Sequence, residues 1–402
     1  MRLLICLLLL EFSGYSIASS NESSVTGLPA SYQRENKPWL THTEARLRAQ
    51  TLSEVAYQLQ IDLSGDKQYH GTVTIKFNYQ PSEHPLTLDF LDGTILSVSR
   101  NSLEIPFEYN GHHISIPPGS FKQGRNEISI RYLHSYSKTG AGLYRYVDST
   151  DQRVYLYTMF EPYDANRMVP SFDQPNLRAT WSLSVTVPNG WVVVSSNREQ
   201  RIEVGESDSV WHFPASKPIS SYILPLHAGQ YHQWQGMAGN VPLRLFARES
   251  LAKSVNADWY LDVTARGMGF FEQYFDEPYP FAKYDQLIVP DFNIGGMENV
   301  GAVTYTEGYV PRGEPTRDRL QGIANTFLHE LAHMWFGDLV TIDWWNALWL
   351  KESFASVMAP LALPSAGYED AWLSFYLEDK QGAYQADEQV TTHPIEMLVP
   401  DT

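Results

Sequence analysis

The sequence predicts two main parts, an all-β antiparallel domain followed by an α+β domain. From about Thr51 to His232, apolar and polar residues alternate in short runs that Gly, Pro and Asn interrupt. The pattern changes between Gly236 and Pro242, and helical periodicity dominates beyond it. Because 43% of the 402 residues are hydrophobic, each part can bury a core. The sequence therefore predicts a multidomain protein.

Residues 1–18 have the pattern of a cleavable signal peptide. A positive charge at Arg2 precedes the apolar run from Leu3 to Leu10, and small residues allow cleavage after Ala18. The run is too short to span a bilayer. We therefore expect a secreted or periplasmic protein without stable membrane insertion. Cleavage would also remove Cys6, the only cysteine, so any metal site must consist of His and carboxylate ligands.

The expected β domain covers residues 19–239. Strict alternation between turns predicts antiparallel sheets with one solvated face. The clearest alternating segments are residues 72–79, 86–90, 127–132 and 181–187.

The expected α+β domain covers residues 240–402. Its segments of helical periodicity are Ala252–Tyr274, Pro315–Phe336 and Asn346–Met358. A short β-rich interval, Gln286–Tyr309, lies between the first two helices.

The net charge of −17 disfavours nucleic acid and anionic membranes as partners. Binding to phosphate requires clustered Lys and Arg, which an acidic chain does not supply. The simplest interpretation of the acidity is solubility.

The second expected helix contains the sequence His329-Glu330-Leu331-Ala332-His333. Residues four apart share a helix face, so both imidazoles can bind one ion while Glu330 acts as general base on a metal-bound water. The pentapeptide alone also arises by chance, but Glu352 on the third expected helix supplies a further ligand. Two His and one Glu leave one position of Zn²⁺ open for water, as in catalytic sites. These ligands suit zinc without excluding other divalent ions.

A glycine-rich segment, Gly295-Gly296-Met297-Glu298-Asn299, precedes an expected strand. By itself it predicts an ordinary hairpin turn. Together with the zinc helix, it resembles the exopeptidase motif of the M1 aminopeptidase family, whose members are aminopeptidase N-like gluzincins. The segments His333–Thr341, Leu348–Ala355 and Phe160–Pro175 are similar to the same family, and the four motifs occur in family order.

The resemblance implies a saddle-like β domain and a thermolysin-like catalytic domain. It also implies a zinc aminopeptidase that removes the N-terminal residue from peptides, with Glu161 and Glu298 binding the free α-amine. Two carboxylates favour the charged form of an α-ammonium and fix which peptide bond reaches zinc. The further substrate-binding residues that the resemblance implies are Gly295, Gly296, Met297, Asn299 and Met159.

Two departures from the family pattern affect the expected activity. Met159 stands where the family usually has Gln, so we expect a more apolar first side-chain pocket. The family's oxyanion-binding tyrosine lies beyond a segment resembling His393-Pro394, which Tyr368, Tyr376 and Tyr384 all precede. We therefore expect a truncated catalytic domain without the family's C-terminal helical domain. The alternatives are an impaired fragment that binds zinc and peptides without efficient turnover, and an endopeptidase, against which Glu161 and Glu298 argue.

Overall fold

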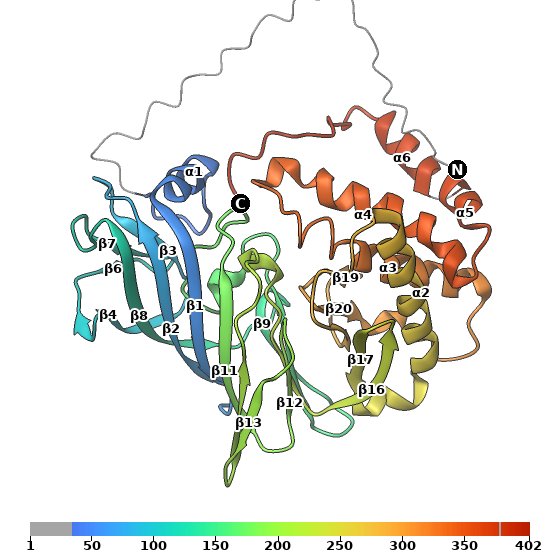
Figure 1. The fold of residues 1–402 in the computed structure, drawn as a ribbon, viewed down its shortest axis with the longest axis horizontal. Coiled ribbons are helices and arrows are strands. Elements are labelled where there is room, and N and C mark those ends of the chain that lie inside the picture. The colour runs from blue at the N-terminus through green and yellow to red at the C-terminus, as the bar shows by residue number, and fades with distance from the viewer. Residues whose placement is uncertain (1–33, 378) are drawn as a thin grey trace, which may run out of the picture. The chain divides into compact units, whose positions relative to one another are not determined.

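The computed structural model describes residues 34–377 and 379–402. The expected signal peptide and Cys6 lie outside the described residues. The described chain contains a β-rich part followed by an α+β part (Figure 1), as the sequence predicts. A helix that the sequence pattern did not predict, α1 (His42–Thr51), precedes the first strand. Thr41 and Glu44 form a capping box at its start, which stabilises the first turn.

The β-rich part is built on an eight-stranded sheet in the order β13-β14-β11-β1-β2-β8-β4-β5. Its strands are β1 (Leu52–Asp62), β2 (Gln68–Tyr79), β4 (Thr94–Arg100), β5 (Leu103–Glu104), β8 (Gly124–Ser135), β11 (Thr180–Pro188), β13 (Arg201–Val204) and β14 (Asp208–Phe213). In β2, Val73, Ile75 and Phe77 are buried while the residues between them reach solvent. The predicted alternation is therefore confirmed. One pairing differs from the expectation, since β1 and β11 are parallel, and alternation carries no information on strand direction.

Two smaller sheets complete this part. One has the order β12-β15-β10-β9 and the other β3-β7-β6. Their strands are β12 (Val192–Val194), β15 (His227–Gly229), β10 (Val154–Met159), β9 (Gly142–Val147), β3 (Leu86–Asp89), β7 (His113–Ile116) and β6 (Glu108–Tyr109). The turn that follows β10 carries Glu161.

A buried cluster of ion pairs connects α1 with strand β3. The Asp89 carboxylate pairs with Arg34 and, at 2.7 Å, with Arg48, and it accepts the backbone N–H of Asp173 at 2.9 Å. Burial would raise the pKa of Asp89, but the two arginines lower it to about 2. An aspartate with a lowered pKa stabilises the fold above its ordinary pKa, and this contribution disappears as the pH falls towards 2.

Replacing Asp89 with Asn is expected to lower the free energy of unfolding at pH 7 by about 3–5 kcal/mol, because two buried arginines lose their countercharge. The difference from wild type should shrink between pH 4 and pH 2, where Asp89 itself becomes protonated. Urea unfolding of wild type and variant at pH 7, pH 4 and pH 2 measures this difference in the free energy of unfolding. The control is the exposed Asp92→Asn. A constant difference across this range would contradict the assignment of the ion pairs to Asp89.

The α+β part contains a five-stranded sheet in the order β16-β17-β18-β20-β19. Its strands are β16 (Tyr231–Ala238), β17 (Val241–Arg248), β18 (Tyr284–Val289), β20 (Ala302–Thr306) and β19 (Gly296–Met297). The boundary expected at 239/240 falls within the turn of the β16–β17 hairpin, so the sheet of this part begins at Tyr231. Strands β17, β18 and β20 are parallel, and β19 runs antiparallel to β20.

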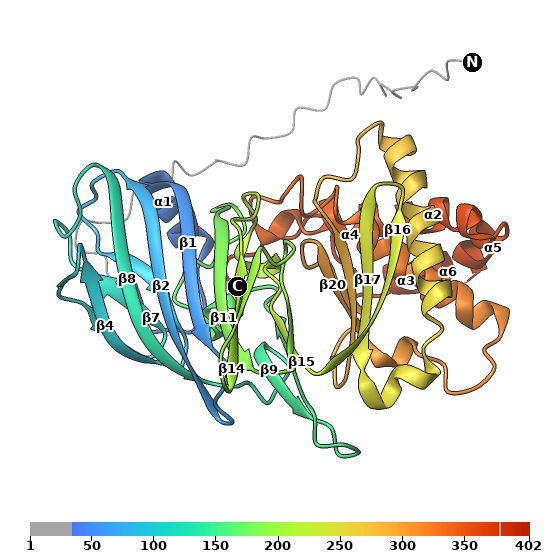
Figure 2. The ribbon, with the colours of Figure 1, turned by 60° about the horizontal axis from the view of Figure 1, so that its bottom comes forward.

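Three helices accompany this sheet and confirm the predicted helices with shifted ends; two of them contact its strands, and the last packs on the second (Figure 2). They are α2 (Ala257–Phe275), α3 (Arg317–Ala332) and α4 (Trp349–Ala362). Helix α2 begins later than expected because the Asn256 side chain caps it by accepting the N–H of Trp259. Two short helices, α5 (Ala371–Leu377) and α6 (Asp379–Asp387), follow without having been predicted.

Candidate metal and substrate site

Helix α3 carries the first two expected metal ligands. It begins after Thr316, whose hydroxyl accepts the N–H of Arg319 at 3.2 Å. His329 lies in its last turn, and His333 follows directly with helical backbone angles, its N–H bonding to the His329 carbonyl at 3.3 Å. The side chains that anchor the helix are apolar and fully buried: Ile323, Ala324, Phe327, Leu328 and Leu331. This anchoring fixes where the two imidazoles point.

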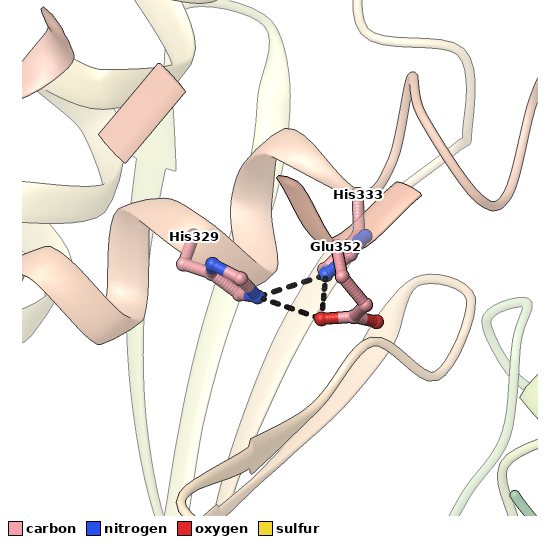
Figure 3. Close-up of side chains that lie close together, drawn as sticks. All are labelled: His329, His333 and Glu352. Atoms are coloured by element: carbon pink, nitrogen blue, oxygen red, sulfur yellow. Dashed lines mark hydrogen bonds and ion pairs between the residues drawn. The ribbon is translucent and has the colours of Figure 1, made fainter. Parts of the chain in front are cut away.

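Helix α4 packs against α3 and brings Glu352 to the two histidines. The Nε2 atoms of His329 and His333 are 3.0 Å apart, and the Glu352 Oε2 atom lies 3.5 Å and 3.8 Å from them (Figure 3). Two ligand atoms bound to one tetrahedral zinc ion stand about 3.3 Å apart. The three side chains therefore fit a single small cation.

His333 and Glu352 are held in the protonation states that bind a metal. His333 Nδ1 lies 2.9 Å from the carbonyl oxygen of Phe336, so it donates its proton there and leaves the Nε2 lone pair free. Burial lowers the pKa of His333 to about 4, which keeps the imidazole neutral. Burial would raise the pKa of Glu352, but hydrogen bonding to His329 and the charge of Lys351 keep it below its ordinary value. His333 therefore offers a neutral nitrogen, and Glu352 offers an ionised oxygen.

Glu330 lies against the glycine-rich segment. Its side chain is buried, and ligand atoms of Glu330, Glu298 and His333 lie within 4.8 Å of one another. A Cβ on Gly296 would lie only 2.5 Å from Glu330 Cδ, so only glycine lets β19 approach this carboxylate. Burial raises the pKa of Glu330 well above its ordinary value, and the charges of Glu298 and Glu352 raise it further.

Replacing Gly296 with Ala is therefore expected to displace Glu330 and lower any hydrolytic activity that depends on it by about 10²-fold, since small misplacements near the chemistry cost this much. The control is Gly322→Ala on α3, where an added Cβ meets nothing within 4 Å. Both variants should unfold near the wild-type temperature. Equal activity of the two variants would contradict the predicted contact.

Of the other side chains in the glycine-rich segment, some lie in the site and some in the hydrophobic core. Glu298 is 3% exposed and belongs to the carboxylate cluster. The Met297 side chain is buried in the hydrophobic core, and the Asn299 side chain donates to Thr304 Oγ1 at 3.0 Å. The side chains of these two expected substrate-binding residues therefore hold the segment in place. At Gly295, an added Cβ would lie 2.5 Å from the Tyr309 hydroxyl.

Glu161 reaches the site from the β-rich part. Ligand atoms of Glu161, Glu298 and Glu352 lie within 4.8 Å of one another, so one carboxylate is shared with the metal triad. Burial and the neighbouring Glu298 raise the pKa of Glu161 to about 7. Burial would also raise the pKa of Glu298, but Lys351 holds it below its ordinary value. The structure thus joins residues from both parts in one acidic cluster.

Lys351 is the site residue that sequence reasoning missed. Its Nζ lies 2.6 Å from Glu161 Oε1, 2.5 Å from Glu298 Oε1 and 2.6 Å from Glu352 Oε1, and the side chain is 1% exposed. The one available signal was a lysine within the apolar sequence that leads to Glu352. Its partners come from three separate segments, which the sequence alone cannot bring together.

The remaining residues of interest are Met159 and three tyrosines. Met159 is partly buried at the end of β10 and packs against the hydrophobic core of the β-rich part. Tyr368 is buried in the core of the α+β part, while Tyr376 and Tyr384 are each 51% exposed. No contact between these tyrosines and the metal triad occurs among the described residues. None of the helices among residues 34–377 and 379–402 has the length and apolar character that a bilayer crossing requires.

Comparison with known proteins gives matches over most of the chain. Curated relatives include aminopeptidase N of Streptomyces lividans, 39% identical over 374 residues that cover 90% of this chain and 43% of that protein. Aminopeptidase N of Rattus norvegicus is 29% identical over 386 residues, 92% of this chain and 39% of that protein. Probable aminopeptidase 1 of Saccharolobus solfataricus is 31% identical over 348 residues, 86% of this chain and 43% of that protein. The chain thus spans about two fifths of the length of these relatives.

Two family models match successive regions of the chain. The peptidase M1 N-terminal domain matches residues 53–223, and the peptidase family M1 domain matches residues 259–402. The first region lies in the β-rich part, and the second contains the two helices of the metal triad. The chain therefore belongs to peptidase family M1.

Proposed function

We propose that this chain carries the active site of a zinc aminopeptidase, which removes the N-terminal residue from peptides with a free α-amine. The observation that carries the proposal is the shared carboxylate. Glu352 belongs both to the metal triad and to the cluster with Glu161 and Glu298. A substrate ammonium held by that cluster would have its first peptide bond next to the metal.

The side chains of the triad suit Zn²⁺ by type and spacing. A zinc ion held by His329, His333 and Glu352 would supply Lewis acidity for the scissile carbonyl and for the attacking water. Its positive charge would also oppose the raised pKa of Glu330 and keep that carboxylate ionised near neutral pH.

Glu330 then acts as the proton carrier. It takes a proton from the water whose oxygen forms a bond to the carbonyl carbon, and it returns that proton to the nitrogen that leaves when the C–N bond breaks. Glu161 and Glu298 bind the α-ammonium, which limits cleavage to the first peptide bond. The contact of Gly296 with Glu330 keeps the proton carrier beside the substrate's path.

One assay separates this function from its alternatives. The chain is loaded with zinc and incubated with an L-leucyl chromogenic substrate and with its N-acetylated form, with and without a chelator. We expect cleavage of the free-amine substrate only, and its loss with chelator. Cleavage of the acetylated form at a similar rate would favour an endopeptidase. Zinc binding without cleavage of either substrate would favour the impaired fragment.

The apolar side chain of Met159 supports a preference for neutral or apolar N-terminal residues. Replacing Met159 with Gln is expected to lower the ratio of leucyl to arginyl substrate hydrolysis by about ten-fold, since a single methylene in a hydrophobic pocket is worth about 1–3 kcal/mol. The measurement is kcat/KM for alanyl, leucyl and arginyl substrates in wild type and variant. An unchanged ratio would remove Met159 from the specificity pocket.

A further inference from the structure

Lys351 is fully coordinated by carboxylates. A lysine ammonium has three N–H donors, and its three nearest acceptors are oxygens of Glu161, Glu298 and Glu352 at 2.5–2.6 Å. The Nζ atom also lies 5.2 Å from the ring centroid of Tyr222, which is buried beside it and attracts a cation through its face. All of the ammonium's donors are therefore used.

The position of this ammonium coincides with the position that the proposed function gives to the substrate's α-ammonium. Both are primary ammonium groups, and both require acceptors from Glu161 and Glu298. The Oε1 atoms of these two residues already accept from Lys351. Two ammonium groups cannot occupy one point, and like charges at contact repel strongly where water is excluded.

The lysine contact does not prevent metal binding. Lys351 uses Oε1 of Glu352, whereas Oε2 of the same carboxylate faces the two histidines. The metal triad and the Lys351 contacts can therefore exist together.

We propose that the Lys351 ammonium is an internal occupant of the α-ammonium site, which a peptide's N-terminus must displace in order to bind. The inference rests on the proposed aminopeptidase function and makes Lys351 a specificity-determining residue of that reaction. The lysine weakens binding of every free N-terminus by the free energy of its own displacement. It also neutralises part of the acidic cluster while no substrate is present.

The test uses 3-methylbutylamine, a primary amine without a peptide bond, and the zinc-loaded chain. Isothermal titration calorimetry measures the Kd of this amine for wild type, Lys351→Met, Lys351→Arg and the exposed control Lys138→Met. We expect Lys351→Met to bind the amine at least about ten-fold more tightly than wild type, because nothing has to be displaced. Lys351→Arg and Lys138→Met should not bind more tightly than wild type. Unchanged or weaker binding by Lys351→Met would overturn the inference, since Lys351 would then only hold the carboxylates in place.

Two further measurements keep the test decisive. If Lys351→Met unfolds, the shorter Lys351→Asn carries the same expectation. Crystals of the wild type with the amine should show its nitrogen between Glu161 and Glu298 and Nζ of Lys351 moved away. An amine bound elsewhere, with Nζ in place, would overturn the inference.

The amine titration and the peptidase assay can fail separately. If neither wild type nor Lys351→Met cleaves the leucyl substrate, but the variant binds the amine more tightly, Lys351 does occupy an ammonium site. The aminopeptidase proposal then fails, and the role of Lys351 in the specificity of that reaction fails with it. If the wild type cleaves the substrate, we expect Lys351→Met to lower KM about ten-fold. Cleavage by the wild type without tighter amine binding by the variant rejects the inference alone.

Discussion

Replacing Glu330 with Gln is expected to lower kcat for an aminoacyl substrate by about 10²–10⁴-fold, the contribution that a positioned general base makes. Glutamine keeps the size of the side chain and fits against Gly296, but it cannot accept the water's proton. Glu330 is also not one of the three side chains that surround the expected metal position. Zinc content should therefore remain at one ion per chain while turnover is lost.

The comparison needs a variant that removes a carboxylate without touching the site. Glu314 is exposed shortly before α3, so Glu314→Gln should retain full activity. Metal analysis and the thermal unfolding temperature verify that both variants are intact. A Glu330→Gln variant with zinc bound and more than a tenth of wild-type kcat would show that another group carries the proton.

The elements of the α+β part could be predicted because their signals are local. The spacing of His329 and His333 fixes a shared helix face, and the apolar residues between and around them predict a buried helix. Glu352 could be added because its own segment also has helical periodicity. The structure brings these three side chains together at 3.0–3.8 Å.

Other features depend on contacts that no local pattern encodes. The parallel pairing of β1 with β11 joins Ala56 to Thr180, although several strands lie between these residues in the sequence. The segment that follows α6 returns to the start of α1, where the N–H of His42 donates to the Pro400 carbonyl at 2.8 Å. The partners of Lys351 are similarly remote, since Glu161 belongs to the β-rich part. Such long-range pairings are set by how whole elements pack.

The burial of Lys351 in the site is also a feature that no local sequence pattern predicts. Sequence reasoning treats a lysine as a solvated surface charge, because lysine is almost never fully buried without a partner. Burial here is possible only because three carboxylates compensate the charge. Glu161 and Glu298 were identified from the family resemblance, and Glu352 from its place on an expected helix. The cation among them was found only from the structure.

Replacing Glu298 with Gln is expected to lower kcat/KM for free-amine substrates by at least roughly 30-fold, which corresponds to about 2 kcal/mol or more. Glu298 is one of two carboxylates proposed to bind the α-ammonium, and its side chain is 4% exposed. Charge interactions are strongest where water is excluded. Glu161→Gln should have a smaller effect, because the Glu161 side chain is 20% exposed and solvent screens it.

A ligand without an amine distinguishes loss of ammonium binding from damage to the metal site. Acetohydroxamate can bind zinc through its own oxygens, so its affinity should be the same in wild type, Glu161→Gln and Glu298→Gln. The affinity for 3-methylbutylamine should instead fall in both variants, and further in Glu298→Gln, because the buried carboxylate contributes more to ammonium binding. If acetohydroxamate binding falls together with amine binding, Glu298 supports the metal triad itself. The selectivity for free N-termini would then have to come from Glu161 alone.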